Sequence, residues 1–182
     1  MKRAKERFTY QDYLQLPEDK RYEILEGELY VVAAPNTRHQ RVSRNLVFSL
    51  FQHVRERELG ELLHAPYDVI LSEENVVQPD ILFVRKRRIG IIDEMNLRGA
   101  PDLVVEILSP GTRIKDLELK RMIYARCDVP EYWVVDPDAG TVEVLVLSDK
   151  AYASAGTFGK SDLLSSLLLP ELNLPLSTVF PD

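Results

Sequence analysis

The segment over residues 102–108 constrains the fold more than any other part of the chain. Its sequence, Asp-Leu-Val-Val-Glu-Ile-Leu, is too continuously apolar for a strand with one wet face, so we expect burial on both sides. A strand covered on both faces needs a packed layer on each side. A helical pattern follows residues 109–111, and a second apolar strand begins at Glu131. The pattern predicts a mixed sheet flanked by helices, in the α/β or α+β class.

The rest of the chain adds hairpins and one long helix. Residues 21–34 predict a two-stranded hairpin, because two β-rich segments flank Glu26-Gly27-Glu28. Apolar residues recur at helical spacing from Val42 to Val54, which predicts the longest helix, ending near Gly60. Further strands are expected over 62–71, 76–84 (with an edge or bulge at Pro79), 131–136 and 141–147. The chain has 182 residues and no linker or repeat, so we expect a single domain over 1–182.

Composition excludes several classes of protein. A net charge of -6, from 23 basic and 29 acidic residues, argues against binding nucleic acid by bulk charge alone. The single cysteine, Cys127, excludes an intrachain disulfide and a zinc site built on several thiolates. No run of about 18 apolar residues is present, and the basic N-terminus is not followed by an apolar signal core. We therefore expect a cytoplasmic protein that does not enter membranes.

Two carboxylates lie inside apolar strands, Asp80 in 77–84 and Glu106 in 104–108. Burying an ionised carboxylate without a partner is costly, so each needs a cation, a strong donor or a metal nearby. If the two strands are neighbours, Asp80, Glu106 and a main-chain carbonyl such as that of Ile107 form a hard oxygen set that suits Mg²⁺ or Mn²⁺. The alternative is a structural role, either a salt bridge to an arginine or the capping of a sheet edge.

Lys120 is the lysine best placed to join this pair. It stands between Asp116 and Tyr124 at four-residue spacing on the helix that follows the Glu106 strand. A lysine there can hold an attacking water or stabilise negative charge on a phosphate. The alternative is a surface partner of Asp116, with Tyr124 serving only in packing.

These residues resemble the PD-(D/E)XK nuclease superfamily, whose Pro-Asp and Glu-x-Lys pattern is met by Pro79-Asp80 and Glu106 but not at Leu108. The fuller resemblance is to the Uma-type family of restriction-endonuclease-like proteins. It extends over about residues 8–150 and rests on Tyr22-Glu23-Ile24-Leu25-Glu26-Gly27-Glu28-Leu29, Val77-Gln78-Pro79-Asp80-Ile81-Leu82-Phe83-Val84, the segment 100–110, Lys120 and the segment 129–136.

The resemblance implies an α/β restriction endonuclease-like core with a central mixed sheet. It implies that Asp80 and Glu106 bind a divalent metal, Mg²⁺ or Mn²⁺, and that Lys120 replaces the missing strand lysine. Similar nucleases add an upstream acidic residue, and Glu26 matches that position better than Glu23. Strand alternation lets only one of these two face the site. The alternative for Glu26 is a surface carboxylate beside a turn.

Basic residues form two candidate contacts for nucleic acid. The run 85–88 leaves the strand of Asp80 and can place cations beside a phosphate backbone, or it can be a solvated loop. Arg38, Arg41 and Arg44 begin the long helix and can form a second basic edge. His39 can approach the site from that helix, although a lone histidine is more often a surface or packing residue.

The sequence thus favours a metal-dependent endonuclease that hydrolyses phosphodiester bonds of nucleic acid, DNA before RNA, with Asp80, Glu106, Lys120 and Glu26 as catalytic residues. The competing hypothesis is a non-catalytic nucleic-acid- or protein-binding module on the same scaffold, motivated by the acidic net charge and by Leu108. A homodimer is expected, because cutting two strands favours two-fold symmetry. The Leu-rich tail can serve as its interface or cover a sheet face.

Overall fold

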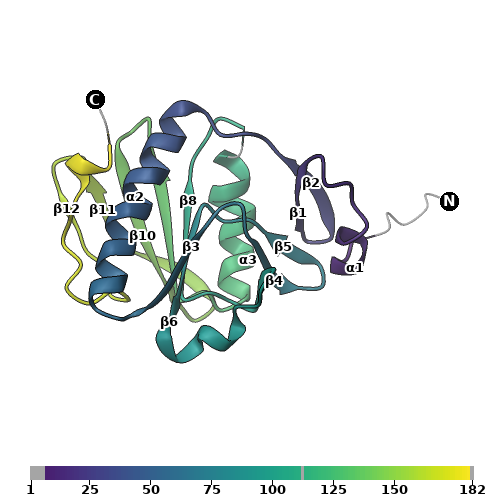
Figure 1. Ribbon diagram of the computed structural model, residues 1–182. Coiled ribbons are helices and arrows are strands. Elements are labelled where there is room, and N and C mark those ends of the chain that lie inside the picture. Colours follow the sequence, from purple (N-terminus) through teal and green to yellow (C-terminus); the bar gives the residue numbers. More distant parts are fainter. Residues whose placement is uncertain (1–6, 112, 181–182) are drawn as a thin grey trace.

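The computed structural model describes residues 7–111 and 113–180. It contains two main β-sheets, one of six strands and one of five (Figure 1). The larger sheet has six strands in the order β11-β10-β9-β8-β6-β3. Its strands are β3 (Gly60–His64), β6 (Ile81–Arg85), β8 (Leu103–Ile107), β9 (Glu131–Asp136), β10 (Thr141–Ser148) and β11 (Ala151–Gly159). β8 runs parallel to β9 and antiparallel to β6, so the sheet is mixed, as predicted.

The second sheet has five strands in the order β2-β1-β5-β4-β7. They are β1 (Arg21–Leu25), β2 (Glu28–Val32), β4 (Asp68–Ser72), β5 (Asn75–Val77) and β7 (Asn96–Arg98). The remaining elements are α1 (Tyr10–Tyr13), α2 (Thr37–Glu56), η1 (Lys86–Ile91), η2 (Lys115–Lys120), α3 (Arg121–Arg126), β12 (Leu163–Leu164), β13 (Leu174–Pro175) and η3 (Leu176–Thr178). None of the helices in the described ranges is long and apolar enough to cross a bilayer.

Strand β8 is the centre of the molecule. All five of its residues are buried, and alternate side chains enter two different cores. Leu103, Val105 and Ile107 pack in the core that α2 covers, whereas Val104 packs in the core that α3 covers. The prediction of a strand covered on both faces is confirmed, and the fold is mixed α/β.

Two segments predicted as single strands each divide between the two sheets. The predicted strand 62–71 is interrupted around Pro66 and gives β3 and β4, while 76–84 is interrupted around Pro79 and gives β5 and β6. Proline donates no main-chain hydrogen bond to a ladder, so a sheet change is favoured at these positions. The edge or bulge expected at Pro79 is thus a change of sheet, and it leaves Asp80 where the two sheets meet.

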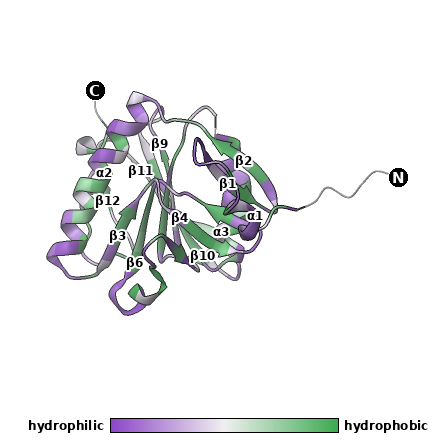
Figure 2. Cartoon of the chain, turned by 45° about the vertical axis from the view of Figure 1, so that its right-hand side comes forward, coloured by the Kyte–Doolittle hydropathy of each residue, from purple (hydrophilic) through white to green (hydrophobic). Residues whose placement is uncertain are grey.

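Helix α2 is amphipathic and begins beside that junction. Asn36 caps it by accepting a hydrogen bond from the amide of His39 at 2.9 Å. Its apolar stripe, Val42, Leu46, Leu50 and Val54, is buried against the six-stranded sheet. Figure 2 shows the hydrophobic strands beneath α2 and the mixed polarity of the helix itself. The first turn of α2 therefore lies next to the end of β8.

The Leu-rich tail covers the core of its own chain. Its leucines 164, 168, 169, 172, 174 and 176 are all buried in the core on the α2 side. The expectation that this tail covers a sheet face is confirmed, and the same leucines are not available as a dimer interface. Strand β11, absent from the prediction, is an edge strand of small and polar residues with little hydrophobic pattern.

Candidate active site

The two carboxylates singled out from the sequence lie side by side. Strands β6 and β8 pair antiparallel with Ile81 opposite Val105, which puts Asp80 at the beginning of β6 beside Glu106 near the end of β8. Oδ2 of Asp80 accepts a hydrogen bond from the main-chain amide of Ile107 at 2.7 Å. The condition stated from the sequence, that the two strands be neighbours, is met.

The side chain of Glu106 is 3% exposed, and residues of the helical segment η2–α3 donate hydrogen bonds to it. Its Oε1 accepts hydrogen bonds from Nζ of Lys120 at 3.0 Å and from the hydroxyl of Tyr124 at 2.5 Å. Both donors point back from the helical segment η2–α3, where η2 is a π-helical turn that ends at Lys120. Lys120 is therefore not a surface partner of Asp116: it is 5% exposed and contacts Glu106 directly.

Lys120 places an ammonium group beside Glu106, whereas position 108 carries a leucine. Leu108 is buried in the α3-side core, where a charged side chain would find no polar surroundings. Nζ of Lys120 reaches Glu106 from the helix and also lies 2.8 Å from Glu23 and 3.6 Å from Asp116. One lysine thus faces three carboxylates.

Of the two upstream acidic residues considered from the sequence, the structure brings Glu23 into this cluster and leaves Glu26 outside it. Glu23, on β1, is 3% exposed and contacts Lys120, while its Oε1 also accepts the amide of Gln78 at 2.9 Å. Glu26 lies in the turn after β1 with φ 55° and pairs with Arg126, outside the cluster. A carboxylate inside an apolar strand was the signal used for Asp80 and Glu106, and it also marks Glu23; the glycine after Glu26 marks a turn.

His39 also belongs to the cluster, so it approaches the site from α2, which is one of the two possibilities that the sequence left open. Its Nε2 lies 3.2 Å from Oδ2 of Asp80, and the side chain is 9% exposed. Burial lowers the pKa of His39, but the hydrogen bond and charge of Asp80, together with the Ile107 main chain, produce a net increase. The signal for this position was the cap residue Asn36, which fixes where α2 begins and which residues fill its first turn.

Negative charge exceeds positive charge in this cluster. Glu23, Asp80, Glu106 and Asp116 are opposed by Lys120 and by His39 when it is protonated. Burial lowers the pKa of Lys120, but the three carboxylates around it raise that pKa well above its usual value, so the lysine stays charged. Burial and the neighbouring carboxylates raise the pKa of Glu106, although Lys120 opposes the shift. An added cation would relieve this excess.

A divalent cation fits the donors present. The Asp80 and Glu106 carboxylates are hard oxygen ligands, and the Ile107 main chain lies against Asp80 and can contribute its carbonyl. Within 7–111 and 113–180, no three His, Cys, Asp or Glu side chains form a ready-made metal site. Main-chain oxygen and water would therefore have to complete the coordination.

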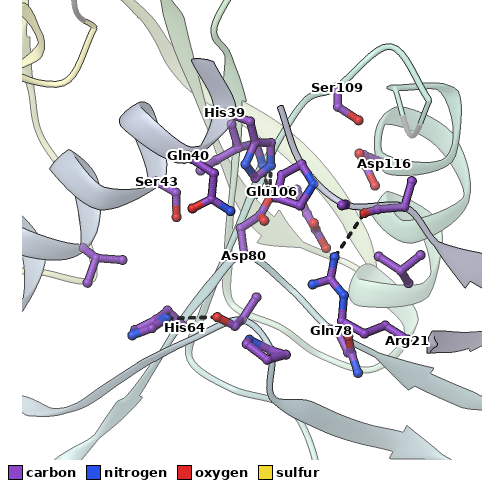
Figure 3. Close-up of a pocket in the computed structure, with 18 of the residues that line it drawn as sticks. Arg21, His39, Gln40, Ser43, His64, Gln78, Asp80, Glu106, Ser109 and Asp116 are labelled. Carbon is purple, nitrogen blue, oxygen red and sulfur yellow. Dashed lines mark hydrogen bonds and ion pairs between the residues drawn. The ribbon is translucent and has the colours of Figure 1, made fainter. Parts of the chain in front are cut away.

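The carboxylate cluster forms the floor of an open pocket of about 870 Å³ (Figure 3). One wall is the first half of α2, which contributes His39, Gln40 and Ser43. The opposite wall carries Arg21, whose guanidinium donates to the carbonyl of Ala33 at 3.0 Å. Asp80 is 19% exposed toward this space, so the cluster is open to a ligand.

The basic run 85–88 lies away from this pocket. It follows the far end of β6, about 17 Å along the strand from Asp80 at about 3.3 Å per residue. Arg88 pairs with Asp102 at 3.0 Å, Arg85 lies 3.8 Å from the same carboxylate, and Lys86 pairs with Glu58. The run is largely occupied with ion pairs of the fold rather than placed beside the site.

Comparison with known proteins identifies the family. The family model described as "Putative restriction endonuclease" (Uma2) matches residues 10–177. A crystal structure of "a putative nuclease belonging to DUF820" from Anabaena variabilis ATCC 29413 superposes with a TM-score of 0.79 and 21% identity, covering 95% of this chain and 97% of that chain. At that identity the likeness establishes the fold. No protein of curated function has a matching sequence. The chain therefore belongs to the Uma2 family and has the restriction endonuclease-like fold.

Proposed function

We propose that this protein is a metal-dependent endonuclease that hydrolyses phosphodiester bonds of DNA. The observation that carries the proposal is the convergence of Asp80 and Glu106, with Lys120 on Glu106, at the floor of an open pocket. Family membership supports a nuclease-like activity. The metal dependence and the DNA substrate go beyond the family assignment and belong to our proposal.

In this proposal Asp80, Glu106 and the carbonyl of Ile107 hold Mg²⁺ or Mn²⁺. When bound, the ion lowers the pKa of a coordinated water and offsets charge on the scissile phosphate. The amide of Ile107 fixes the Asp80 carboxylate, and the hydroxyl of Tyr124 fixes that of Glu106. Both ligands are thus oriented before a substrate arrives.

Lys120 has two functions in the proposed mechanism. Its ammonium group holds Glu106 in place and carries positive charge toward the space that a phosphate would enter. Glu23 positions the lysine from the other side, at 2.8 Å. We replace Glu26 by Glu23 as the upstream acidic residue, because Glu23 contacts Lys120.

The test is metal binding followed by cleavage. Mn²⁺ and Mg²⁺ are titrated calorimetrically into wild type, Asp80→Ala and Glu106→Gln, with Glu26→Gln as a matched control that removes a nearby carboxylate outside the cluster. We expect binding in wild type and the control and none in the two site variants. Free metal at a concentration of 100 times its Kd should also raise the free energy of unfolding by about 2.7 kcal/mol in wild type and in the control, but not in the two site variants.

Cleavage is then measured on single-stranded and duplex DNA with each metal. We expect Asp80→Ala to abolish cleavage while the Tm changes little. Wild-type rates in Asp80→Ala would disprove the assignment. DNA binding without product under any metal would favour the non-catalytic binding module.

The proposed site needs one chain only. The homodimer and the cytoplasmic location expected from the sequence remain part of the proposal. Sedimentation velocity tests the first, and fractionation of cells that express the protein tests the second. A monomer at all concentrations would remove the two-fold arrangement without affecting the site.

A further inference from the structure

One face of α2 extends from the carboxylate cluster to two exposed phenylalanines. The residues of α2 that line the pocket recur every three or four positions, so they form one stripe along the helix: His39, Gln40, Ser43, Arg44, Val47, Phe48 and Phe51. Except for His39, which belongs to both sets, the buried residues of α2 are different from those that line the pocket. Val47 also packs against the core, whereas Phe48 and Phe51 are exposed and lie outside that packed core.

The aromatic rings of Phe48 and Phe51 are exposed to solvent. They are 70% and 45% exposed and lie one helical turn apart, at the pocket's wall. Exposed aromatic side chains grouped beside a polar site indicate a binding surface. A ring with a free face offers a stacking partner to any planar ligand, and nucleobases are such ligands.

Acidic and basic side chains line different parts of the pocket. The four acidic residues that line it are the four of the floor cluster, and the remaining lining residues include Arg21 and Arg44 but no carboxylate. Arg44 lies one turn before Phe48 on the same stripe. A phosphate backbone would thus meet arginine and polar donors on the walls, and its bases would meet the rings.

The dimensions favour an unpaired strand over a double helix. At 1.5 Å per residue, Phe48 lies about 13 Å along α2 from His39, which is about four stacked nucleotides at 3.4 Å each. The pocket holds about 870 Å³. An unpaired nucleotide can enter that space, whereas a duplex, whose major groove alone is about 12 Å wide, would have to lie across the mouth of the pocket.

We propose that Phe48 and Phe51 form a base-stacking shelf, with Arg44 on the backbone, that leads single-stranded DNA to the carboxylate cluster. The inference rests on the proposed nuclease function and specifies its substrate class as unpaired DNA, including frayed ends of a duplex. The alternative occupant of the two rings is a second copy of this chain, and the test below distinguishes the two.

The experiment measures binding by fluorescence anisotropy in a chelator, so that cleavage does not interfere. The probes are a labelled single-stranded 12-mer, the same 12-mer in a duplex, and an abasic 12-mer with identical phosphates. The proteins are wild type, Phe48→Ala/Phe51→Ala, Phe48→Leu/Phe51→Leu, and Met95→Ala as a control at an apolar residue that is 77% exposed and outside the pocket lining.

We expect wild type and the Met95→Ala control to bind the single strand at least tenfold more tightly than the abasic strand or the duplex. The alanine double variant should bind the single strand at least about 25-fold more weakly, at about fivefold or more for each of the two rings, and the leucine double variant should not restore binding, because stacking needs a π face. Equal binding of normal and abasic strands, no binding of any strand, or unchanged binding by the alanine double variant would overturn the inference.

Sedimentation velocity of the same proteins tests the alternative occupant. A wild-type dimer that the leucine variant retains and the alanine variant loses would assign the rings to a second copy and overturn the inference. Cleavage separates this result from the proposed function. Metal-dependent product without any effect of the rings would reject the shelf and keep the nuclease, whereas ring-dependent binding without product under any metal would reject the nuclease.

Discussion

The two ends of the β6–β8 strand pair hold buried carboxylates in opposite situations. At one end, Asp102 is 2% exposed, accepts the amide of Arg85 at 2.9 Å and pairs with Arg88 at 3.0 Å. At the other, Glu106 shares Lys120 with two further carboxylates and faces an open pocket. The comparison shows that burial alone does not mark a reactive carboxylate. In our proposal, the charge imbalance around Glu106 and its access to a ligand distinguish it from Asp102.

The largest expected effect on stability is at the end of the strand pair that holds Glu106. Lys120→Met removes the ammonium group that pairs with the buried carboxylates of Glu106 and Glu23, and breaking a buried ion pair in this way costs about 3–5 kcal/mol. We expect that loss in the free energy of unfolding at pH 7, measured by urea denaturation. Adding Glu106→Gln to the variant should recover part of it.

The control for that variant is Lys150→Met, which removes an exposed ion pair with Asp128. It should change stability by no more than about 0.5 kcal/mol. If Lys120→Met were as stable as the control, Lys120 would not be needed to compensate the carboxylates at the Glu106 end, and the proposed difference between the two ends would be wrong.

A smaller effect is expected at the compensated end. Asp102→Asn keeps an oxygen for the Arg85 amide but removes the charge that Arg88 meets, and Arg88 is partly exposed. We expect a loss of about 1–2 kcal/mol on denaturation. The Mn²⁺ calorimetric signal should equal that of wild type. Lost metal binding with unchanged stability would reverse the assignment of the two ends.

The smallest effect is expected at Asp136. Asp136 ends β9 on the same side of the sheet as the end of β8 that carries Glu106, and it pairs with Arg113. Burial raises the pKa of Asp136, but the hydrogen bond from Arg113 and the amides of Ala139 and Asp138 lower it below 3.8 overall. A lowered folded-state pKa stabilises the protein above the unfolded pKa, and this contribution disappears as pH falls through the folded pKa. Asp136→Asn should therefore cost about 1 kcal/mol at pH 7.

Urea denaturation of wild type and Asp136→Asn from pH 7 to pH 2.5 measures this dependence. The difference in unfolding free energy should be constant down to about pH 5 and shrink below pH 4. A difference that does not change over this range would mean that Asp136 acts through packing rather than through charge.

Sequence reasoning found the central strand, the long helix, both hairpins and three members of the cluster, Asp80, Glu106 and Lys120. It succeeded there because a carboxylate in an apolar strand, and a lysine on the next helix, are local signals. It chose Glu26 over Glu23 by motif position. Glu26 lies in a turn whose conformation, φ 55°, carries its side chain away to Arg126.

Other features depended on contacts between distant segments. The role of His39 required the start of α2 to lie beside the junction of two sheets, 41 residues away in sequence from Asp80. The division of two predicted strands between sheets followed from long-range pairing, which proline permits but does not specify. The ion pairs that occupy the run 85–88 likewise required Asp102 and Glu58 to be placed.

The sequence by itself determined the central strand, the long helix and the burial of Glu106, because hydrophobic periodicity and the cost of burying charge are properties of short segments. Only the tertiary structure decided the charge balance around each carboxylate. It placed one lysine among three carboxylates at one end of β8 and two arginines around a single carboxylate at the other. Electrostatic energy depends on distances between residues far apart in the chain, and folding sets those distances.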